Sequence, residues 1–170
     1  MKKVVRGIYE WSKLILFALV IAFWLKNNVV ASALVPTGSM EQTVMTGSRI
    51  VINRLAYMCD APRRGDIVSF YYPDDGETLY LKRIMGLPGE VIEGIDGKVY
   101  IDGRLVPDFT KNRFYEDFGP YKIPEDSYFM MGDNRGNSWD SRYWTNKFVA
   151  FEDIIGRAEF EYYPEIKVLK

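Results

Sequence analysis

An unbroken apolar run occupies residues 14–25 (LILFALVIAFWL) near the start of the chain. A membrane-crossing helix needs about 20 residues, so this run reaches that length only together with its flanks. Lys13 and Lys26 can extend their ammonium groups toward lipid headgroups, and tryptophans near both ends suit the two interfaces. The pattern predicts a transmembrane helix over residues 11–33, preceded by a short segment of residues 1–10.

The same segment also has the features of a cleaved signal peptide. Lys2 and Lys3 form a basic start, residues 14–25 an apolar centre, and residues 31–33 read Ala-Ser-Ala, the form of a cleavage site. The segment by itself leaves both interpretations open. A buried core helix is disfavoured, because a run without a polar face needs burial on all sides and the rest of the chain has strand-like patterns.

After Pro36 the pattern changes from helical to strand-like. Short segments rich in β-branched and aromatic residues alternate with Gly, Pro and Asp. The predicted strands are residues 49–55, 66–72, 78–85, 91–95, 98–101, 105–106, 127–131 and 158–163, with one helical turn at 152–155. Asp-Gly pairs at 96–97 and 102–103 are strong signals for two-residue hairpins. The fold class is therefore mainly β: one mostly antiparallel domain, residues 34–170, attached to a single helix.

Composition narrows the possible chemistry. The chain has 170 residues, enough for one ordinary domain, and its net charge of −1 lacks the basic excess typical of nucleic-acid binding. A single cysteine, Cys59, rules out an intrachain disulfide. The absence of histidine excludes Ser-His-Asp and Cys-His catalytic groups and Cys/His zinc sites. We expect neither a metal nor a cofactor.

Charge is distributed unevenly along the chain. Residues 1–35 carry a net charge of +4 and the remainder −5. A basic N-terminus joined to an acidic body is typical of a membrane element. The positive-inside rule places Lys2, Lys3 and Arg6 in the cytoplasm and the domain after the helix outside it.

Three segments carry the candidate chemistry, and each has a simpler alternative. Residues 36–40 (PTGSM) follow the apolar run and read equally as an ordinary turn. Residues 80–90 (YLKRIMGLPGE) place Lys82 and Arg83 on opposite faces of a strand, so one of them faces inward if either face is buried; the alternative is an edge strand with charged gatekeepers. Residues 132–142 (GDNRGNSWDSR) read also as a solvated loop, while a calcium loop fails because an arginine occupies a ligand position.

A serine hydroxyl becomes a good nucleophile only with a base in hydrogen-bond reach. Without histidine, a neutral lysine is the natural candidate for that base. Free lysine has a pKa of about 10.4, and complete burial lowers it by as much as about 3–5 units. Lys82, on a strand rich in aromatic and aliphatic residues, meets this requirement, and a second hydroxyl such as that of Ser138 could orient its amine. The sequence alone leaves open whether these residues meet in space.

The apolar run, these three segments and residues 64–68 (RGDIV) follow one another in the order found in bacterial type I signal peptidases. The chain closely resembles this family of membrane-anchored Ser/Lys proteases, which remove signal peptides from exported proteins. The resemblance covers nearly the whole chain, from residue 10 to residue 160. Each motif is weak by itself, but five elements in the same order are highly specific.

The resemblance implies a role for each matching residue. Ser39 is the expected nucleophile and Lys82 the expected general base, positioned by Ser138. Thr37, where Ser is also common in the family, and the Ser39 backbone N–H match the oxyanion hole. The residues expected to support or shape the site are Met40, Arg83 paired with Asp133, Asp140 paired with Arg142, Gly132 and Asn134.

The family also implies a fold, partners and a location. Its fold is a twisted, largely antiparallel β domain with a shallow apolar groove, into which the substrate adds as an extended strand. Small pockets select Ala-like residues at the first and third positions before the cut. The implied partners are signal-peptide-bearing preproteins, the lipid bilayer and, by proximity, the secretion translocon, with no nucleic acid. The implied location is the cell membrane, with a retained single-pass helix, a cytoplasmic N-terminus and an extracytoplasmic catalytic domain.

Other classes remain in competition. Self-cleaving repressors of the Ser/Lys type are soluble, and the apolar N-terminus argues against them. A specialised peptidase for conjugation or pilus proteins is compatible with the same motifs. A non-catalytic binding module would have been favoured by loss of Ser39 or Lys82, and both are present. The eukaryotic and archaeal type, which uses histidine as its base, is excluded.

Overall fold

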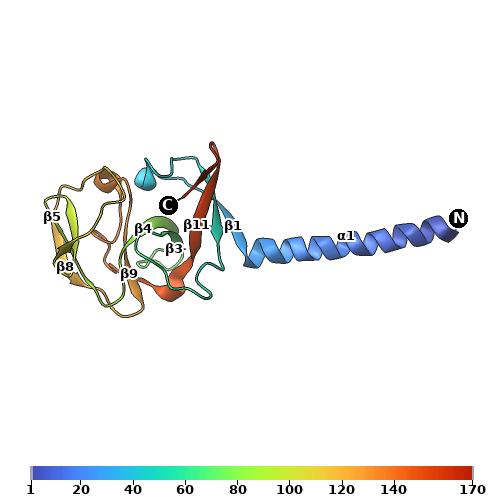
Figure 1. The fold of residues 1–170 in the computed structure, drawn as a ribbon, viewed down its shortest axis with the longest axis horizontal. Coiled ribbons are helices and arrows are strands. Elements are labelled where there is room, and N and C mark those ends of the chain that lie inside the picture. Colours follow the sequence, from blue (N-terminus) through green and yellow to red (C-terminus); the bar gives the residue numbers. More distant parts are fainter. Residues whose placement is uncertain (1, 170) are drawn as a thin grey trace.

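The computed structural model describes the backbone of residues 2–169 and the side chains of residues 9–26 and 28–169. A long helix, α1 (Lys2–Asn28), projects away from a β domain formed by the rest of the chain (Figure 1). The strands β5 and β8 lie at the end of this domain opposite the helix. Apolar side chains along α1 are exposed, so the helix does not contribute them to the core of the domain.

Within residues 2–169 the β domain contains two antiparallel sheets. The larger has the order β1-β2-β11-β3-β4-β9-β10, with β12 paired to β11. Its strands are β1 (Val30–Leu34), β2 (Arg49–Asn53), β3 (Ile67–Tyr71), β4 (Leu79–Gly86), β9 (Ser127–Met131), β10 (Val149–Ala150), β11 (Ile154–Tyr163) and β12 (Lys167–Val168). β1 forms one edge. β4 pairs with β3 on one side and, from Arg83 onward, with β9 on the other, and its Lys82 and Arg83 side chains are both buried, so the alternative of an edge strand with charged gatekeepers is wrong.

The smaller sheet has the order β7-β6-β5-β8. Its strands are β5 (Val91–Ile95), β6 (Lys98–Ile101), β7 (Arg104–Leu105) and β8 (Phe118–Lys122). Asp96 and Gly97, with φ of 51° and 71°, connect β5 to β6, and Asp102 and Gly103, with φ of 50° and 71°, connect β6 to β7. Both central residues of a type I′ turn need positive φ, so the two hairpin signals are confirmed.

Buried apolar side chains form three clusters in the described part of the chain. The small-sheet cluster, which includes Phe118 and Phe129, joins the two sheets. The Met40 cluster consists of Val35, Met40, Val44, Ile50, Ile52, Ile67, Ala158 and Leu169. The Trp144 cluster lies on the other side of β3 and β4 and consists of Val68, Phe70, Ile84, Tyr128, Met130, Trp144 and Val149.

β4 is covered on both of its faces. Leu81 packs against the Met40 cluster, and Ile84 belongs to the Trp144 cluster. Lys82 and Arg83 are consequently both buried, with 4% and 1% of their surface exposed. Alternation required only one of them to face inward, and the second is buried because apolar layers cover both sides of this strand.

All eight expected strands have a counterpart in the structure, and the differences have local causes. β5, β6 and β9 have the predicted bounds. β11 begins at Ile154 rather than residue 158, directly after the 3₁₀ turn η3 (Phe151–Asp153), which replaces the helical turn expected at 152–155. The sequence pattern does not predict β1, β8, β10 or β12. β10 and β12 are too short to alternate, and β8 contains a glycine and a proline.

The helix expected over residues 11–33 has different bounds. α1 begins at Lys2 and ends at Asn28, and Val30–Leu34 forms β1, which pairs with β2 along its whole length. The inward side chains of β1 pack against the Met40 cluster, and this burial favours the strand over a longer helix. The Ala-Ser-Ala sequence of residues 31–33 is therefore part of a paired strand.

None of the helices formed by the described residues combines the length and the apolar character needed to cross a membrane. The side chains of Lys2, Lys3 and Arg6, on which the expected orientation depends, lie outside the described residues.

Candidate active site

The Ser39 turn, residues 36–40, is held from both ends. Before it, the backbone N–H of Val35 donates to the carbonyl of Ser48, at 2.9 Å. Ser39 lies within a 3₁₀ turn, η1 (Gly38–Met40), and the next residue, Met40, is fully buried in its cluster. Ser39 itself is 8% exposed. The Ser39 hydroxyl is thus held in place by the hydrogen-bonded backbone before it and by the buried side chain of Met40 after it.

Lys82 on β4 meets Ser39 directly. Its Nζ lies 2.6 Å from the Oγ of Ser39 and 5.2 Å from the centre of the Tyr80 ring. Burial, the main cause, lowers the pKa of Lys82 from its ordinary 10.5 to about 8; the carboxylate of Asp140 opposes this shift and the cation of Arg142 adds to it. A sizeable fraction of Lys82 is therefore neutral in mildly alkaline solution.

This contact answers the question that the sequence left open. A neutral amine at hydrogen-bond distance from a hydroxyl can accept its proton while the oxygen attacks an electrophile. Ser39 and Lys82 come from segments far apart in the chain, and the curled sheet brings them together. The arrangement is chemically suited to acyl transfer through serine.

The two other expected hydroxyls differ in their contacts. The Oγ1 of Thr37 lies 3.4 Å from the Oγ of Ser39, on the exposed side of the turn. The Oγ of Ser138 is buried and has no hydrogen-bond partner among the described residues. The hydrogen bond expected between Ser138 and Lys82 is therefore absent from this structure, although both residues line the same groove.

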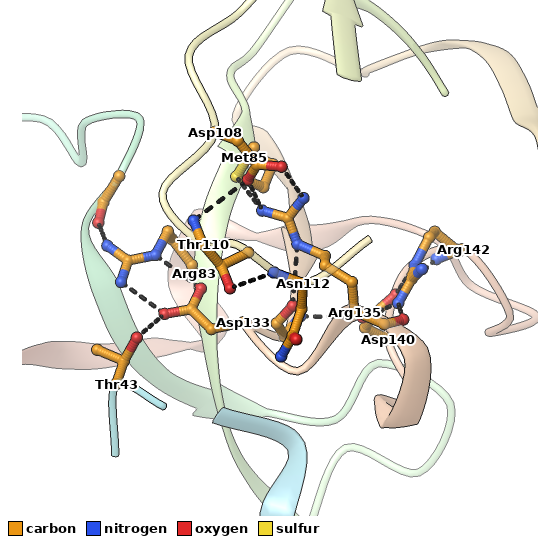
Figure 2. A network of polar contacts seen from close by, with 12 residues as sticks. Thr43, Arg83, Met85, Asp108, Thr110, Asn112, Asp133, Arg135, Asp140 and Arg142 are labelled. Carbon is orange, nitrogen blue, oxygen red and sulfur yellow. Dashed lines mark hydrogen bonds and ion pairs between the residues drawn. The ribbon is translucent and has the colours of Figure 1, made fainter. Parts of the chain in front are cut away.

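Residues 132–142, called here the 132–142 segment, carry the two expected ion pairs (Figure 2). Asp133 accepts hydrogen bonds from Nε and Nη2 of Arg83, at 2.8 and 2.6 Å. Asp140 accepts from Nε and Nη2 of Arg142, at 2.7 and 2.9 Å. All four residues are buried, and bidentate pairing of this kind is among the strongest polar contacts in proteins. The Arg83–Asp133 pair links the segment to β4, and the Asp140–Arg142 pair links two residues within the segment.

Two further residues of the segment contact the Ser39 turn. The backbone N–H of Asn134 donates to the carbonyl of Ser39, at 3.0 Å, and its side-chain amide donates to the carbonyl of Gly38, at 2.9 Å. A Cβ atom added to Gly132 would lie 2.4 Å from the carbonyl oxygen of Ser39 and 2.2 Å from the Oγ of Ser138. The close approach of these segments therefore requires glycine at position 132.

Sequence reasoning missed three members of this network, which Figure 2 labels. Arg135, almost fully buried, pairs with Asp108 at 2.9 Å and donates from Nε to the carbonyl of Gly132 at 3.1 Å. Thr43 donates to Asp133 at 2.5 Å. Arg135 belongs to the 132–142 segment, and the presence of two arginines in that segment was an available signal. No sequence pattern marks Asp108 or Thr43, because they lie in other segments of the chain and reach this network only in the folded protein.

A groove of about 1000 Å³ runs beside Ser39 and Lys82. Residues 32–39 and residues 78–82 supply most of its lining and are called here its two walls. Within the described residues, β1 pairs only with β2, and β9 pairs with β4 only from Arg83 onward. Both walls thus present backbone groups that an extended peptide can pair with. Among the described residues, no group of three or more His, Cys, Asp or Glu is placed to hold a metal ion.

Comparisons with known proteins agree on one family. The family described as "Signal peptidase, peptidase S26" matches residues 8–163. The chain is 34% identical to the probable signal peptidase I-2 of Synechocystis sp. over 94% of its length and 75% of the relative, and 35% identical to signal peptidase I S of Bacillus subtilis over 94% and 91%. A solved signal peptidase I from Enterococcus faecalis is similar with a TM-score of 0.50 and 32% identity, covering 58% of this chain and 97% of that one.

The contact between Gly132 and the Ser39 turn leads to a stability prediction. Gly132→Ala places a methyl group against a backbone carbonyl that cannot rotate away, so we expect a loss of about 1–3 kcal/mol in the free energy of unfolding. Gly136→Ala is the matched control in the same segment, because its added Cβ would meet no atom closer than 3.4 Å. Denaturant unfolding of both variants measures the difference. Equal unfolding free energies would show that position 132 tolerates a side chain.

Proposed function

The chain belongs to the signal peptidase S26 family, which consists of serine proteases, and from this we propose that Ser39 and Lys82 form its catalytic dyad. Signal peptidases act on preproteins that carry signal peptides, and we assign this chain the removal of such peptides from exported proteins. One observation carries the assignment: Nζ of Lys82 lies 2.6 Å from the Oγ of Ser39, in a buried position that opens into the groove.

In the first half of the proposed reaction, neutral Lys82 accepts the proton of the Ser39 hydroxyl while Oγ attacks the scissile carbonyl carbon. A tetrahedral oxyanion forms. Its collapse breaks the C–N bond, and the ammonium of Lys82 donates its proton to the leaving amine. The mature protein departs with a new N-terminus, and the signal peptide remains as an ester on Ser39.

In the second half, Lys82, neutral again, accepts a proton from a water molecule that attacks the ester carbonyl. The second tetrahedral oxyanion collapses with transfer of the proton back to Ser39 Oγ. The signal peptide leaves as a carboxylic acid, and both side chains return to their starting states. The lysine thus alternates between base and acid, which requires a pKa near the working pH.

Stabilisation of the oxyanion is assigned to two donors beside the nucleophile. The hydroxyl of Thr37 lies 3.4 Å from the Oγ of Ser39, on the open side of the turn. The backbone N–H of Ser39 is the second proposed donor. Each such donor supplies stabilisation where negative charge develops.

The substrate is proposed to bind as an extended strand between β1 and the start of β4. Both walls offer unpaired backbone edges within the described residues, and the lining includes small and aliphatic side chains such as Ala33, Val35 and Leu81. Side chains of an extended peptide alternate, so the first and third residues before the cut point to the same side of the peptide backbone. This supports cleavage after an Ala-x-Ala-like site.

The remaining motif residues are proposed to position the dyad. Ser138, whose buried hydroxyl is unpartnered among the described residues, is assigned the orientation of the Lys82 amine once substrate is bound. Hydrogen bonds, ion pairs and packing hold the supporting residues in place. These residues are Met40, Arg83, Gly132, Asp133, Asn134, Asp140 and Arg142.

Anchoring in the cell membrane is proposed for α1. The family is membrane-associated, the apolar side chains of residues 14–25 are exposed, and Lys13 and Lys26 flank them. In this proposal residues 1–10 are cytoplasmic, and the catalytic domain, residues 34–170, lies outside, close to the lipid bilayer and to the translocon from which preproteins emerge.

The dyad predicts that Ser39→Ala and Lys82→Met each abolish processing of a preprotein by the detergent-solubilised full chain. Because the two residues act as a unit, the double variant should be scarcely slower than either single variant. Mass spectrometry of the new N-terminus measures the cleavage, and circular dichroism checks the fold. Substantial cleavage by Lys82→Met would refute the dyad.

The oxyanion proposal predicts different outcomes for two substitutions of Thr37. Thr37→Val keeps the shape but removes the hydroxyl, so kcat should fall by about 10²–10³ with little change in KM. Thr37→Ser keeps the donor and should remain active. Steady-state kinetics on one preprotein measures both variants. If Thr37 only stiffens the turn, Val and Ser will behave alike.

The lowered pKa of Lys82 predicts an alkaline-leaning pH profile. The neutral amine is the active form, so kcat/KM should rise with pH and level off above the pKa of about 8. At pH 6 it should be about a hundredfold below the plateau. Lys82→Arg should be inactive at every pH tested, because guanidinium keeps its proton in this range. An optimum below pH 6 would indicate a carboxylate base instead.

The proposed orientation predicts that protease added to intact protoplasts digests the domain after α1. Residues 1–10, carrying an epitope tag, should be cut only after lysis. Immunoblotting for both ends of the chain reads the result. Protection of the β domain in intact protoplasts would reverse the assigned topology.

A further inference from the structure

Ser69 is a polar side chain on the otherwise apolar floor of the groove. It lies on β3, opposite Leu81 of β4, and is 5% exposed. Strand alternation places it on the same face as Ile67, whose side chain belongs to the Met40 cluster, whereas Val68 and Phe70 face the Trp144 cluster. Ser69 therefore faces the groove from among aliphatic neighbours.

Among the described residues, the hydroxyl of Ser69 has no hydrogen-bond partner. Its cross-strand neighbour Leu81 and its same-face neighbour Ile67 are aliphatic and offer it no partner. It is also not among the unpartnered oxygens that are sealed from the surface, so a ligand in the groove can reach it. Burying an unpaired hydroxyl costs free energy, which a ligand hydroxyl would recover.

The location of Ser69 in the groove can be matched to one residue of an extended substrate. Along the opposite wall, the inward residues Ala33 and Val35 are two positions apart, the spacing of the first and third side chains before the cut in an extended peptide. Val35 is nearer to Ser39 in the chain, so Ala33 is assigned to the third position. Ala33 pairs with Ile50, whose side chain lines the groove together with Ser69.

We propose that Ser69 makes the third-position pocket selective for a hydroxyl side chain, so that a signal peptide with Ser three residues before the cut is preferred over one with Ala. The proposal rests on the proposed function. The serine of the peptide and Ser69 would each act as donor or acceptor, forming one hydrogen bond in an environment that excludes water. Ala33 and Ser69, both small, leave room for the extra oxygen.

The test uses two preproteins that differ only in Ser or Ala at the third residue before the cut. The kcat/KM for each is measured with the full chain, with Ser69→Ala, and with Ser127→Ala as the matched control outside the groove lining. The Ser-to-Ala preference should be about threefold to tenfold larger for the unmodified chain than for Ser69→Ala, the range of one neutral hydrogen bond. Ser127→Ala should keep the full preference. An unchanged preference in folded Ser69→Ala would overturn the proposal.

A second measurement separates this proposal from the proposed function. The Kd of the same two preproteins is determined with Ser39→Ala, with and without Ser69→Ala, so that no cleavage is needed. Loss of the preference on removal of the Ser69 hydroxyl supports the pocket even if the unmodified chain cleaves neither preprotein, a result that would refute only the proteolytic role. Equal Kd ratios in the two backgrounds would refute the pocket whatever the activity.

Discussion

The burial of a lysine amine, that of Lys82, is the constraint on which the proposed site depends. Burial lowers the pKa of Lys82 from 10.5 to about 8, which corresponds to destabilisation of the charged form by about 3 kcal/mol relative to a free lysine. Only a well-covered strand supplies that environment, and β4 is covered on both faces by apolar clusters. The same layers hold Ser39 at 2.6 Å through the buried neighbour Met40.

The adjacent basic residues Lys82 and Arg83 of β4 differ in whether a carboxylate pairs with them. Arg83 has a bidentate partner in Asp133, whereas no carboxylate lies within ion-pair distance of Lys82 among the described residues. A carboxylate beside Lys82 would stabilise its ammonium form and raise its pKa. Asp140, the acid that acts on Lys82 from farther away, is itself bound to Arg142, so its charge is largely engaged. The fold thus gives buried Arg83 a counter-ion and leaves buried Lys82 without one among the described residues.

The groove owes its form to incomplete pairing. β1 leaves one edge free, and β9 joins β4 only from Arg83 onward, so the stretch of β4 before that residue also has a free edge within the described residues. Exposed strand edges are usually protected against further pairing. Here they flank Ser39 and Lys82, where the proposed extended substrate would complete the ladder.

Local sequence determined the hairpins at Asp96-Gly97 and Asp102-Gly103, the bounds of β5, β6 and β9, and the set of motif residues that line the site, because turn chemistry and alternation act between near neighbours. The absence of histidine and the family motifs indicated Ser39 and Lys82 as the candidate nucleophile and base. Only the tertiary structure decided that residues 30–34 form a strand, that both Lys82 and Arg83 are buried, that Ser138 lacks a partner among the described residues, and that Arg135 pairs with Asp108. These features depend on contacts between residues far apart in the chain, which no local pattern encodes.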